Sequence, residues 1–166
     1  MPGGVGETVE TGIHTNVDEL DVKIIARLVN DSRIPFRQLA RELGVSESTI
    51  YMRVRRLKER GILKGFTACL DLNRLGLVQQ VYIEVKASPQ HIRNVVEELV
   101  SYPNVLEVYE VSGEYPLLIK VASTSSEELT STVDRIALIK GVTEMDVKYV
   151  FKTLESEGVR KIFLRA

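Results

Sequence analysis

The chain has 166 residues, 44% hydrophobic residues and a net charge of −1, a balance that suits one or two globular domains. No apolar run approaches the roughly 18 residues of a membrane span. The single cysteine, Cys69, excludes a disulfide framework and a cysteine-based metal cluster. Residues 1–16 lack Lys, Arg and a hydrophobic block, so we expect a disordered tail there rather than a signal peptide. These features favour a cytoplasmic protein.

Charge is distributed unevenly along the chain. Residues 18–65 carry 11 basic and 7 acidic side chains, a net charge of +4. Residues 66–166 carry 11 basic and 14 acidic side chains, a net charge of −3. The positive charge of residues 18–65 and the negative charge of the rest indicate that only the N-terminal part binds a polyanion such as nucleic acid.

Apolar residues recur at helical spacing in two segments near the start of the chain. The first helix is predicted over residues 18–30, with Asn16 or Asp18 as its N-cap. The second is predicted to begin with Pro35 at its first helical position and to end before Gly44. A helix that ends in Leu-Gly-Val-Ser before another helix predicts the tight connection of a helix-turn-helix.

The third helix, predicted from its N-cap Ser46 onwards, is apolar on one side and basic on the other. Ile50, Val54 and Leu57 fall in one sector and are expected to be buried. A major groove accepts one α-helix, which is read mainly through its N-terminal half. Short hydroxyl side chains allow close approach to bases, and arginine suits guanine edges or phosphates. The residues expected to contact double-stranded DNA are Ser46, Ser48, Thr49, Tyr51, Met52, Arg53, Arg55 and Arg56.

Different roles are predicted within this set. Base contacts are expected from Ser48, Thr49 and Met52. Phosphate contacts are expected from Arg53 and Arg56, and either kind from Arg55. An isolated basic helix is more often a solvated surface, but the two helices and the turn before it favour DNA binding.

The stretch VSESTIYMRVRRLKERGILKGF (45–66) closely resembles the N-terminal domain of the Lrp/AsnC family, the feast/famine transcription regulators. The likeness begins at the DELD of residues 18–21 and continues through QLARELGVS without a gap. Glycine ends the third helix at Gly61, and an apolar, strand-prone segment follows. This order predicts a wing strand, and hence a winged helix-turn-helix.

Alternating strands and amphipathic helices predict a second domain of order βαββαβ, the ferredoxin-like fold. Its strands are predicted at residues 81–87, 105–111, 117–123 and 142–154. Its helices are predicted to start at Ser88-Pro89 and at a cap formed by Ser126. The expected class is α+β, with a disordered tail (1–16), a winged helix-turn-helix domain (17–66), a connecting strand and hinge (67–80) and the second domain (81–166).

The resemblance implies the role of the second domain, which is called RAM in the family. RAM domains stack sheet on sheet into a homodimer, and dimers commonly assemble further into octamers. Stacking would also cover a sheet face and edges that are otherwise exposed. Family members often bind an amino acid between dimers, and the matching residues here are Gly113, Glu114, Tyr115, Val142, Met145 and Val147.

The effector pattern departs from the family at four positions. Pro116 stands where the family usually has an acidic residue, Lys140 stands in place of the proline of a Pro-Gly-Val pattern, and Met145 and Val147 stand in place of threonines. If these two side chains face the site, its lining is partly apolar and an amino-acid-like effector should have an apolar side chain. A site that serves only as an oligomer contact, or a plain hairpin turn at SGEYP, stays open as an alternative.

An enzyme on the same scaffold is the second hypothesis, because siroheme decarboxylase subunits share this two-domain layout. That chemistry typically needs histidine, and the only histidines are His14 and His91. The sequence has no glycine-rich phosphate loop, no metal-spaced His/Cys cluster and no nucleophile elbow. A regulator without catalytic residues, metal or cofactor, and with no membrane partner, is therefore expected.

Overall fold

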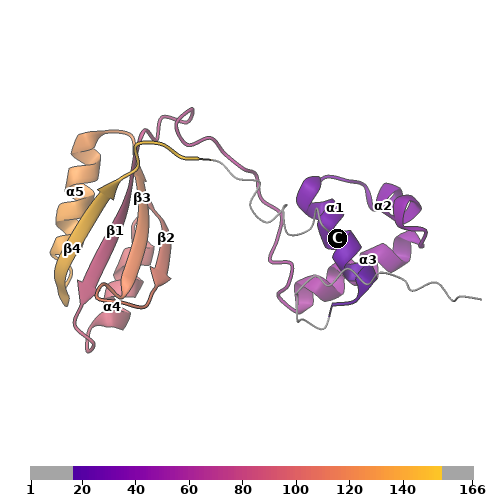
Figure 1. Cartoon of the computed structure of the whole chain (residues 1–166), viewed down its shortest axis with the longest axis horizontal. Helices are drawn as coiled ribbons and strands as arrows, with labels where there is room; N and C mark the ends of the chain where they lie inside the picture. The colour runs from indigo at the N-terminus through magenta and orange to yellow at the C-terminus, as the bar shows by residue number, and fades with distance from the viewer. Residues whose placement is uncertain (1–16, 155–166) are drawn as a thin grey trace, which may run out of the picture. The chain divides into compact units, whose positions relative to one another are not determined.

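The computed structural model describes residues 17–154, in which residues 17–68 and 69–153 form two compact units (Figure 1). The predicted disordered tail (1–16) lies outside the described residues, as does the end of the predicted second domain. Each unit has its own apolar core. In the described part of the chain, no helix is long and apolar enough to cross a membrane.

The first unit is a bundle of three helices, α1 (Glu19–Asn30), α2 (Phe36–Leu43) and α3 (Glu47–Glu59). The predicted caps are confirmed at both α1 and α3. Asp18 Oδ1 accepts the N–H of Asp21 at 3.0 Å, and Ser46 Oγ accepts the N–H of Thr49 at 3.1 Å. Gly44 ends α2 in the left-handed conformation, with φ 68°, which a residue without Cβ adopts at little cost.

Two predictions for this unit are wrong in detail. Pro35 is the N-cap of α2 rather than its first helical residue: its ψ of 136° is extended, while its carbonyl accepts the N–H of Leu39 at 3.0 Å. The expected wing strand after Gly61 is also missing, because residues 61–78 form no strand. A strand needs a neighbour to pair with, and the described chain offers this segment none.

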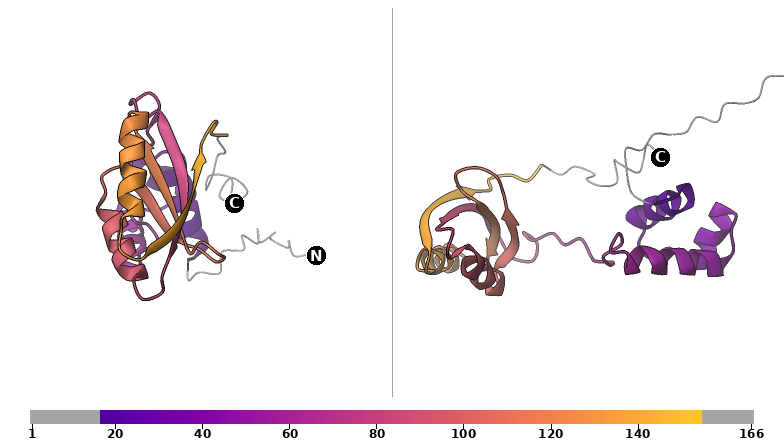
Figure 2. Two further views of the ribbon diagram at one scale, coloured as in Figure 1. Left: turned by 90° about the vertical axis from the view of Figure 1, so that its left-hand side faces the viewer. Right: turned by 90° about the horizontal axis from the view of Figure 1, so that it is seen from below.

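The second unit is a four-stranded antiparallel sheet of order β2-β3-β1-β4, with both helices on one face (Figures 1 and 2). This confirms the βαββαβ prediction. The elements are β1 (Gln79–Ala87), α4 (Ile92–Ser101), β2 (Val105–Glu110), β3 (Leu117–Ser123), α5 (Ser126–Ala137) and β4 (Val142–Tyr149).

Side chains alternate along β1 as its sequence predicts. Val81, Ile83 and Val85 are fully buried in the core under the helices. Tyr82 and Glu84 therefore lie on the opposite, helix-free face of the sheet. One face of the sheet thus builds the core, and the other carries polar and aromatic groups.

The ends of several elements differ from the prediction, among them β1, which begins two residues earlier, at Gln79, and β2, which ends one residue earlier, at Glu110. α4 begins only at Ile92, because the N–H of His91 donates to Ser88 O at 2.9 Å and closes a turn first. Ser125 caps α5, one residue before the predicted cap. β4 ends at Tyr149 rather than at residue 154, because its neighbour β1 begins at Gln79 and leaves the later residues without a partner strand.

Candidate nucleic-acid interface and effector site

The third helix divides into a buried and an exposed side, as predicted. Ile50, Val54 and Leu57 are buried between α1 and α2. Of the predicted DNA contacts, the exposed residues are Ser46, Ser48, Tyr51, Met52, Arg55 and Arg56, and the half-buried ones are Thr49 and Arg53. Met52 is 59% and Tyr51 56% exposed although both are large and apolar, so neither belongs to the core of this unit.

Three hydroxyl groups cluster at the N-terminus of α3. Ser46 Oγ lies 2.8 Å from Ser48 Oγ and 2.7 Å from Thr49 Oγ1, and it also accepts the N–H of Thr49. These short side chains project at the positive end of the helix. They can approach base edges closely and can both donate and accept hydrogen bonds.

The arginines of α3 differ in how they are paired. Arg53 Nη1 donates to Asp18 Oδ2, and it lies 3.2 Å from Oδ1 of Asp21. The hydrogen bond from Arg53 lowers the pKa of Asp18. Arg55 Nε lies 2.8 Å from Oε1 of Glu59. The Arg56 side chain makes no ion pair with any residue that the structure describes, so its charge is directly available to a phosphate.

Two arginines of α2 were missed in the sequence. Arg37 and Arg41 are exposed one turn apart, beside a shallow hollow on α2. Their neighbour Glu42 turns to α1 instead, where its Oε2 lies 2.8 Å from Arg27 Nη2. Within residues 17–154, neither Arg37 nor Arg41 forms an ion pair. Their i, i+4 spacing was visible in the sequence, but which cation Glu42 neutralises was not.

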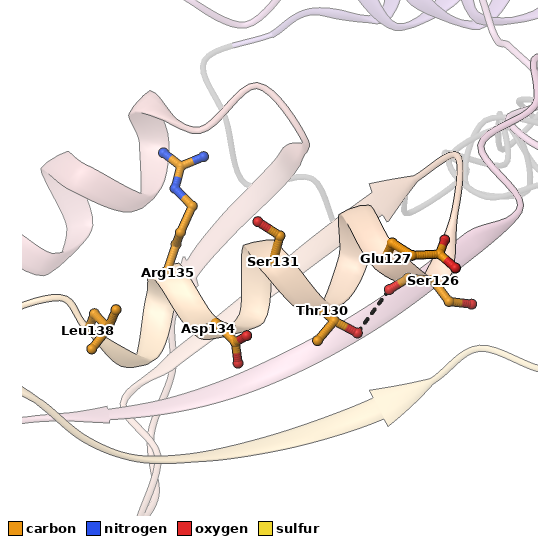
Figure 3. A pocket seen from close by; sticks show the side chains of 7 residues that line it. All are labelled: Ser126, Glu127, Thr130, Ser131, Asp134, Arg135 and Leu138. Atoms are coloured by element: carbon orange, nitrogen blue, oxygen red, sulfur yellow. Dashed lines mark hydrogen bonds between the residues drawn. The ribbon is translucent and has the colours of Figure 1, made fainter.

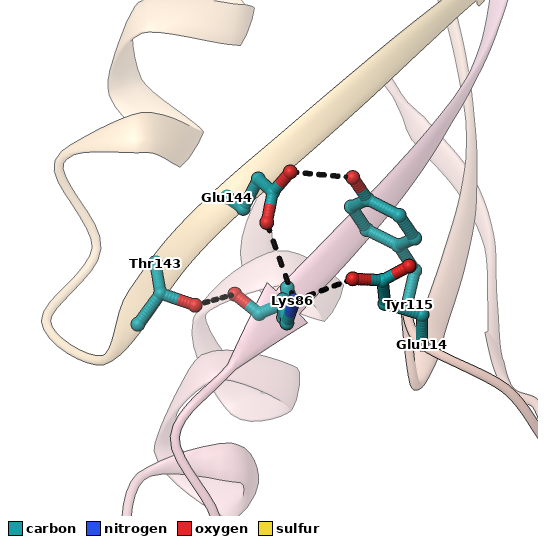
Figure 4. A network of polar contacts seen from close by, with 5 residues as sticks. All are labelled: Lys86, Glu114, Tyr115, Thr143 and Glu144. Carbon is teal, nitrogen blue, oxygen red and sulfur yellow. Dashed lines mark hydrogen bonds and ion pairs between the residues drawn. The ribbon is translucent and has the colours of Figure 1, made fainter.

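A polar network occupies one end of the helix-free side of the sheet (Figure 4). Lys86 Nζ lies 2.9 Å from Glu114 Oε1 and 3.3 Å from Glu144 Oε2, and the Tyr115 hydroxyl donates to Glu144 Oε1 at 2.7 Å. The Tyr115 hydroxyl and the Lys86 amino group lower the pKa of Glu144. Thr143 Oγ1 adds a bond to Lys86 O at 3.2 Å.

The structure brings together only part of the predicted effector site. Glu114 and Tyr115 meet in this network, and Gly113 lies in the same loop with φ 122°. The three predicted residues of β4 do not join them: Val142, Met145 and Val147 pack against the core under α4 and α5. Successive side chains of a strand point to opposite faces, so Glu144 lies on the face that carries the polar network and Met145 lies on the core face. The expected apolar lining is therefore absent from this side of β4.

A shallow hollow also lies along the exposed side of α5 (Figure 3). Its lining residues are Ser126, Glu127, Thr130, Ser131, Asp134, Arg135 and Leu138. The hydroxyl of Thr130 donates to the carbonyl of Ser126 at 2.9 Å, and the Arg135 guanidinium lies 4.3 Å from the centre of the Tyr102 ring. Both groups are thus engaged within the protein, and the hollow shows no converging set of free polar groups.

Comparison with known proteins identifies the family. Residues 17–58 match the AsnC-type helix-turn-helix domain, and residues 80–159 match the Lrp/AsnC ligand binding domain. The chain belongs to the Lrp/AsnC family of DNA-binding transcription regulators. It is 39% identical over 137 residues to the HTH-type transcriptional regulator FL11 of Pyrococcus horikoshii, which covers 82% of this chain and 91% of the relative.

Solved protein structures share the fold. E. coli AsnC has a TM-score of 0.81 at 26% identity and covers 88% of this chain and 99% of that one. A transcriptional regulator of Neisseria meningitidis, solved as a complex with L-Met, has a TM-score of 0.77 at 22% identity and covers 84% and 93%. The family and fold predicted from the residues of the first domain are thus confirmed.

The histidine considered for the enzyme hypothesis has a local partner. His91 Nδ1 lies 2.9 Å from Ser88 Oγ, in the turn before α4. His14 lies outside the described residues. Among residues 17–154, no group of three His, Cys, Asp or Glu side chains could hold a metal ion. Membership of a regulator family and this local role of His91 give no support to the enzyme hypothesis.

Proposed function

We propose that this Lrp/AsnC regulator binds pseudo-palindromic operators as a homodimer, with α3 of each copy in a major groove. The observation that carries the proposal is the division of α3 into a buried apolar side and an outer side of hydroxyls, Met52 and arginines. Two-fold symmetry would put the two helices a whole number of helical turns apart on one side of the duplex.

The proposed contacts divide between bases and phosphates. Base edges meet the N-terminal half of α3, through Ser46, Ser48, Thr49 and Met52. Phosphates meet Tyr51, Arg55 and Arg56, together with Arg37 and Arg41 of α2. In a helix-turn-helix the first helix crosses the DNA backbone while the second lies in the groove, which supports the role given to α2.

Selection of duplexes from a random-sequence pool by the full chain, followed by footprinting, tests this proposal. We expect a consensus with two inverted halves whose centres lie about 10 base pairs, or a multiple of that, apart. A footprint over a single asymmetric half-site, with no periodic extension, would contradict the dimer.

We propose that the helix-free sheet face makes the homodimer. Tyr82 lies on this face, and Tyr109 pairs with Leu118 across β2 and β3, so apolar groups are present on it. The sheet also carries ion pairs, such as that between Lys120 Nζ and Glu107 Oε1 at 3.5 Å. Light scattering should give a dimer or a multiple of it, up to an octamer, and a monomer at micromolar concentration would contradict this surface.

We propose that a small amino-acid-like effector binds at the sheet end formed by Gly113, Glu114, Tyr115, Lys86 and Glu144. The carboxylates suit an ammonium group, and the glycine loop offers backbone N–H groups to a carboxylate. The L-Met complex of the Neisseria fold neighbour supports an amino acid as the class of ligand. Because Met145 and Val147 pack into the core, no preference for an apolar side chain follows from them.

Calorimetry against the common amino acids tests the effector site, read beside light scattering with and without each one. Glu114→Gln and Glu144→Gln should abolish or weaken binding at least tenfold, while Glu110→Gln, an exposed neighbour outside the network, should not. An effector would shift assembly only if it binds one oligomer more tightly than another. Unchanged affinity in both glutamine variants would move the site elsewhere.

We propose a cytoplasmic regulator without catalytic activity, because its partner is DNA and the described residues form no converging catalytic group. The exposed, unpaired Cys69 agrees with a reducing compartment. Detection of the protein in a membrane or secreted fraction would contradict the location.

A further inference from the structure

We propose that Arg53 is a positioning residue, which fixes the rotation of α3 against α1, and that it does not contact DNA phosphates. The proposal rests on DNA binding by α3 and names how the reading face of that helix is set. It replaces the role that the sequence pattern predicts for this arginine.

The geometry of the Arg53 contacts supports this role. One nitrogen, Arg53 Nη1, bridges Oδ2 of Asp18 and Oδ1 of Asp21. Asp18 uses its other oxygen, Oδ1, to cap α1. The same carboxylate thus starts α1 and holds the middle of α3, and the two contacts join residues 35 and 32 positions apart.

Asp21 is buried, and its side chain is only 2% exposed. A buried carboxylate without a cationic partner is strongly unfavourable. If Arg53 turned outward to a phosphate, Asp21 would lose the guanidinium that lies 3.2 Å from its Oδ1. An approaching phosphate would also meet the negative charge of Asp18. Both effects oppose a phosphate contact at this position.

Directionality distinguishes this bridge from the apolar packing around it. Ile50, Val54 and Leu57 of α3 share one buried cluster with Ile24 and Leu28 of α1. Apolar contacts depend on buried area and tolerate small rotations. A charge-assisted hydrogen bond depends on direction. The Arg53 bridge is therefore a directional contact that fixes which side chains of α3 face outward.

The test compares two pairs of variants, each matched in charge. Arg53→Met is compared with Arg56→Met, because both remove one cation from α3. Asp18→Asn is compared with Glu19→Gln, because both remove one anion from the start of α1. Asparagine keeps a good N-cap, and Glu19 pairs only with the exposed Lys23 among the described residues. The probes are the duplex selected by the unchanged chain and a random-sequence duplex of the same length.

A positioning role predicts a particular combination of results. Arg53→Met should lower the ratio of specific to random-sequence affinity about tenfold, the order of one lost base-pair contact. It should leave unchanged the salt slope, which is the slope of log affinity against log salt concentration. Arg56→Met should reduce the slope by about 0.9, the loss of one phosphate contact. Asp18→Asn should lower the ratio relative to Glu19→Gln. Simple loss of fold would instead weaken binding to both duplexes equally.

A phosphate contact predicts the opposite. Arg53→Met would then reduce the slope as much as Arg56→Met does. Asp18→Asn would free the arginine, so random-sequence binding would tighten and its slope would steepen relative to Glu19→Gln. Either result overturns the proposal.

Hydrogen exchange separates this proposal from the operator proposal. If the unchanged chain selects no duplex, the operator proposal fails, but the bridge can still be measured in the full chain. Amides in the first turn of α1 and in the middle of α3 should exchange faster in Asp18→Asn than in Glu19→Gln. Equal exchange in the two variants would overturn the bridge. The mild Asp18→Asn change keeps the test valid if Arg53→Met does not fold.

Discussion

Arg55 Nε lies 2.8 Å from Oε1 of Glu59, one turn further along the exposed side of α3. The hydrogen bond with Glu59 raises the pKa of Arg55, which is charged at neutral pH in any case. Its neighbour Arg56 forms no ion pair within the described residues. These two adjacent arginines therefore differ when DNA approaches: Arg55 must first break its ion pair with Glu59, and Arg56 has no such pair to break.

Glu59→Gln should strengthen binding to random-sequence DNA. The change removes a negative charge from the groove side of α3 and frees Arg55, so the salt slope should steepen by up to about 1. Fluorescence anisotropy over a series of salt concentrations measures both effects. Glu19→Gln on α1 is the charge-matched control, and equal behaviour of the two variants would show that the Arg55 pair does not restrain DNA binding.

Arg56→Ala should weaken binding to all sequences to the same degree. Loss of one phosphate contact should reduce the salt slope by about 1 without changing the preferred operator. Titrations of the selected duplex and of a random-sequence duplex, each at several salt concentrations, check both statements. A loss confined to the selected duplex would instead make this side chain a base contact.

Substitution of Ser48 or Met52 should change which sequences bind best. Both side chains are exposed on the N-terminal half of α3, and Met52 can touch a thymine methyl. Altered preference should amount to about 1–3 kcal/mol per base pair. Repeating the selection with Ser48→Ala, Thr49→Ala and Met52→Ala measures it, and an unchanged consensus from all three would reject the assignment.

The buried side of α3 could be predicted from the sequence because its apolar residues repeat with the period of an α-helix. Ile50, Val54 and Leu57 recur at helical spacing, and nothing outside the helix is needed to place them. The same holds for the alternation of Val81 and Ile83 in β1. The βαββαβ order followed from these local patterns and was confirmed.

The missed features depend on residues far apart in the chain. The bond of Arg53 to Asp18 crosses 35 positions, and no periodic pattern reveals it. In the effector site, family correspondence suggested Met145, while strand alternation brings its neighbour Glu144 beside Lys86 of β1. The wing strand was predicted from local β propensity, but a strand also needs a pairing partner, which no propensity supplies.

Gly141→Ala should destabilise the second unit more than Gly113→Ala does. Both glycines have positive φ, 106° and 122°, so alanine strains the backbone at each by about 1–3 kcal/mol. At Gly141 an added Cβ would also stand 2.3 Å from Cβ of His91, whereas nothing lies within 4 Å at Gly113. Urea unfolding followed by tyrosine fluorescence suits the comparison, because five of the six tyrosines lie in this unit. Equal losses would mean that the turn at His91 moves aside freely.

The network at the sheet end should make the second unit sensitive to acid. Bonds from Tyr115 and Lys86 lower the pKa of Glu144 below its ordinary 4.5. A carboxyl with a depressed pKa stabilises the fold above its unfolded pKa, and the contribution is lost as pH falls through the folded value. Tyr115→Phe should therefore reduce the drop in unfolding midpoint between neutral pH and acid. An identical drop in the variant would show that the exposed network adds no measurable stability.

The hydroxyl cluster at the start of α3 has two arrangements of protons for one arrangement of heavy atoms. Ser46 Oγ has a single proton, yet it lies within hydrogen-bond distance of both Ser48 Oγ and Thr49 Oγ1. When Ser46 donates to Ser48, the Ser48 proton is left to point outward. When the chain of bonds reverses, it is the Thr49 proton that is left. The helix can therefore offer a free O–H donor at either Ser48 or Thr49 without moving an atom heavier than hydrogen. In the proposed DNA complex, this freedom would let the cluster accept more than one base at the position that faces it.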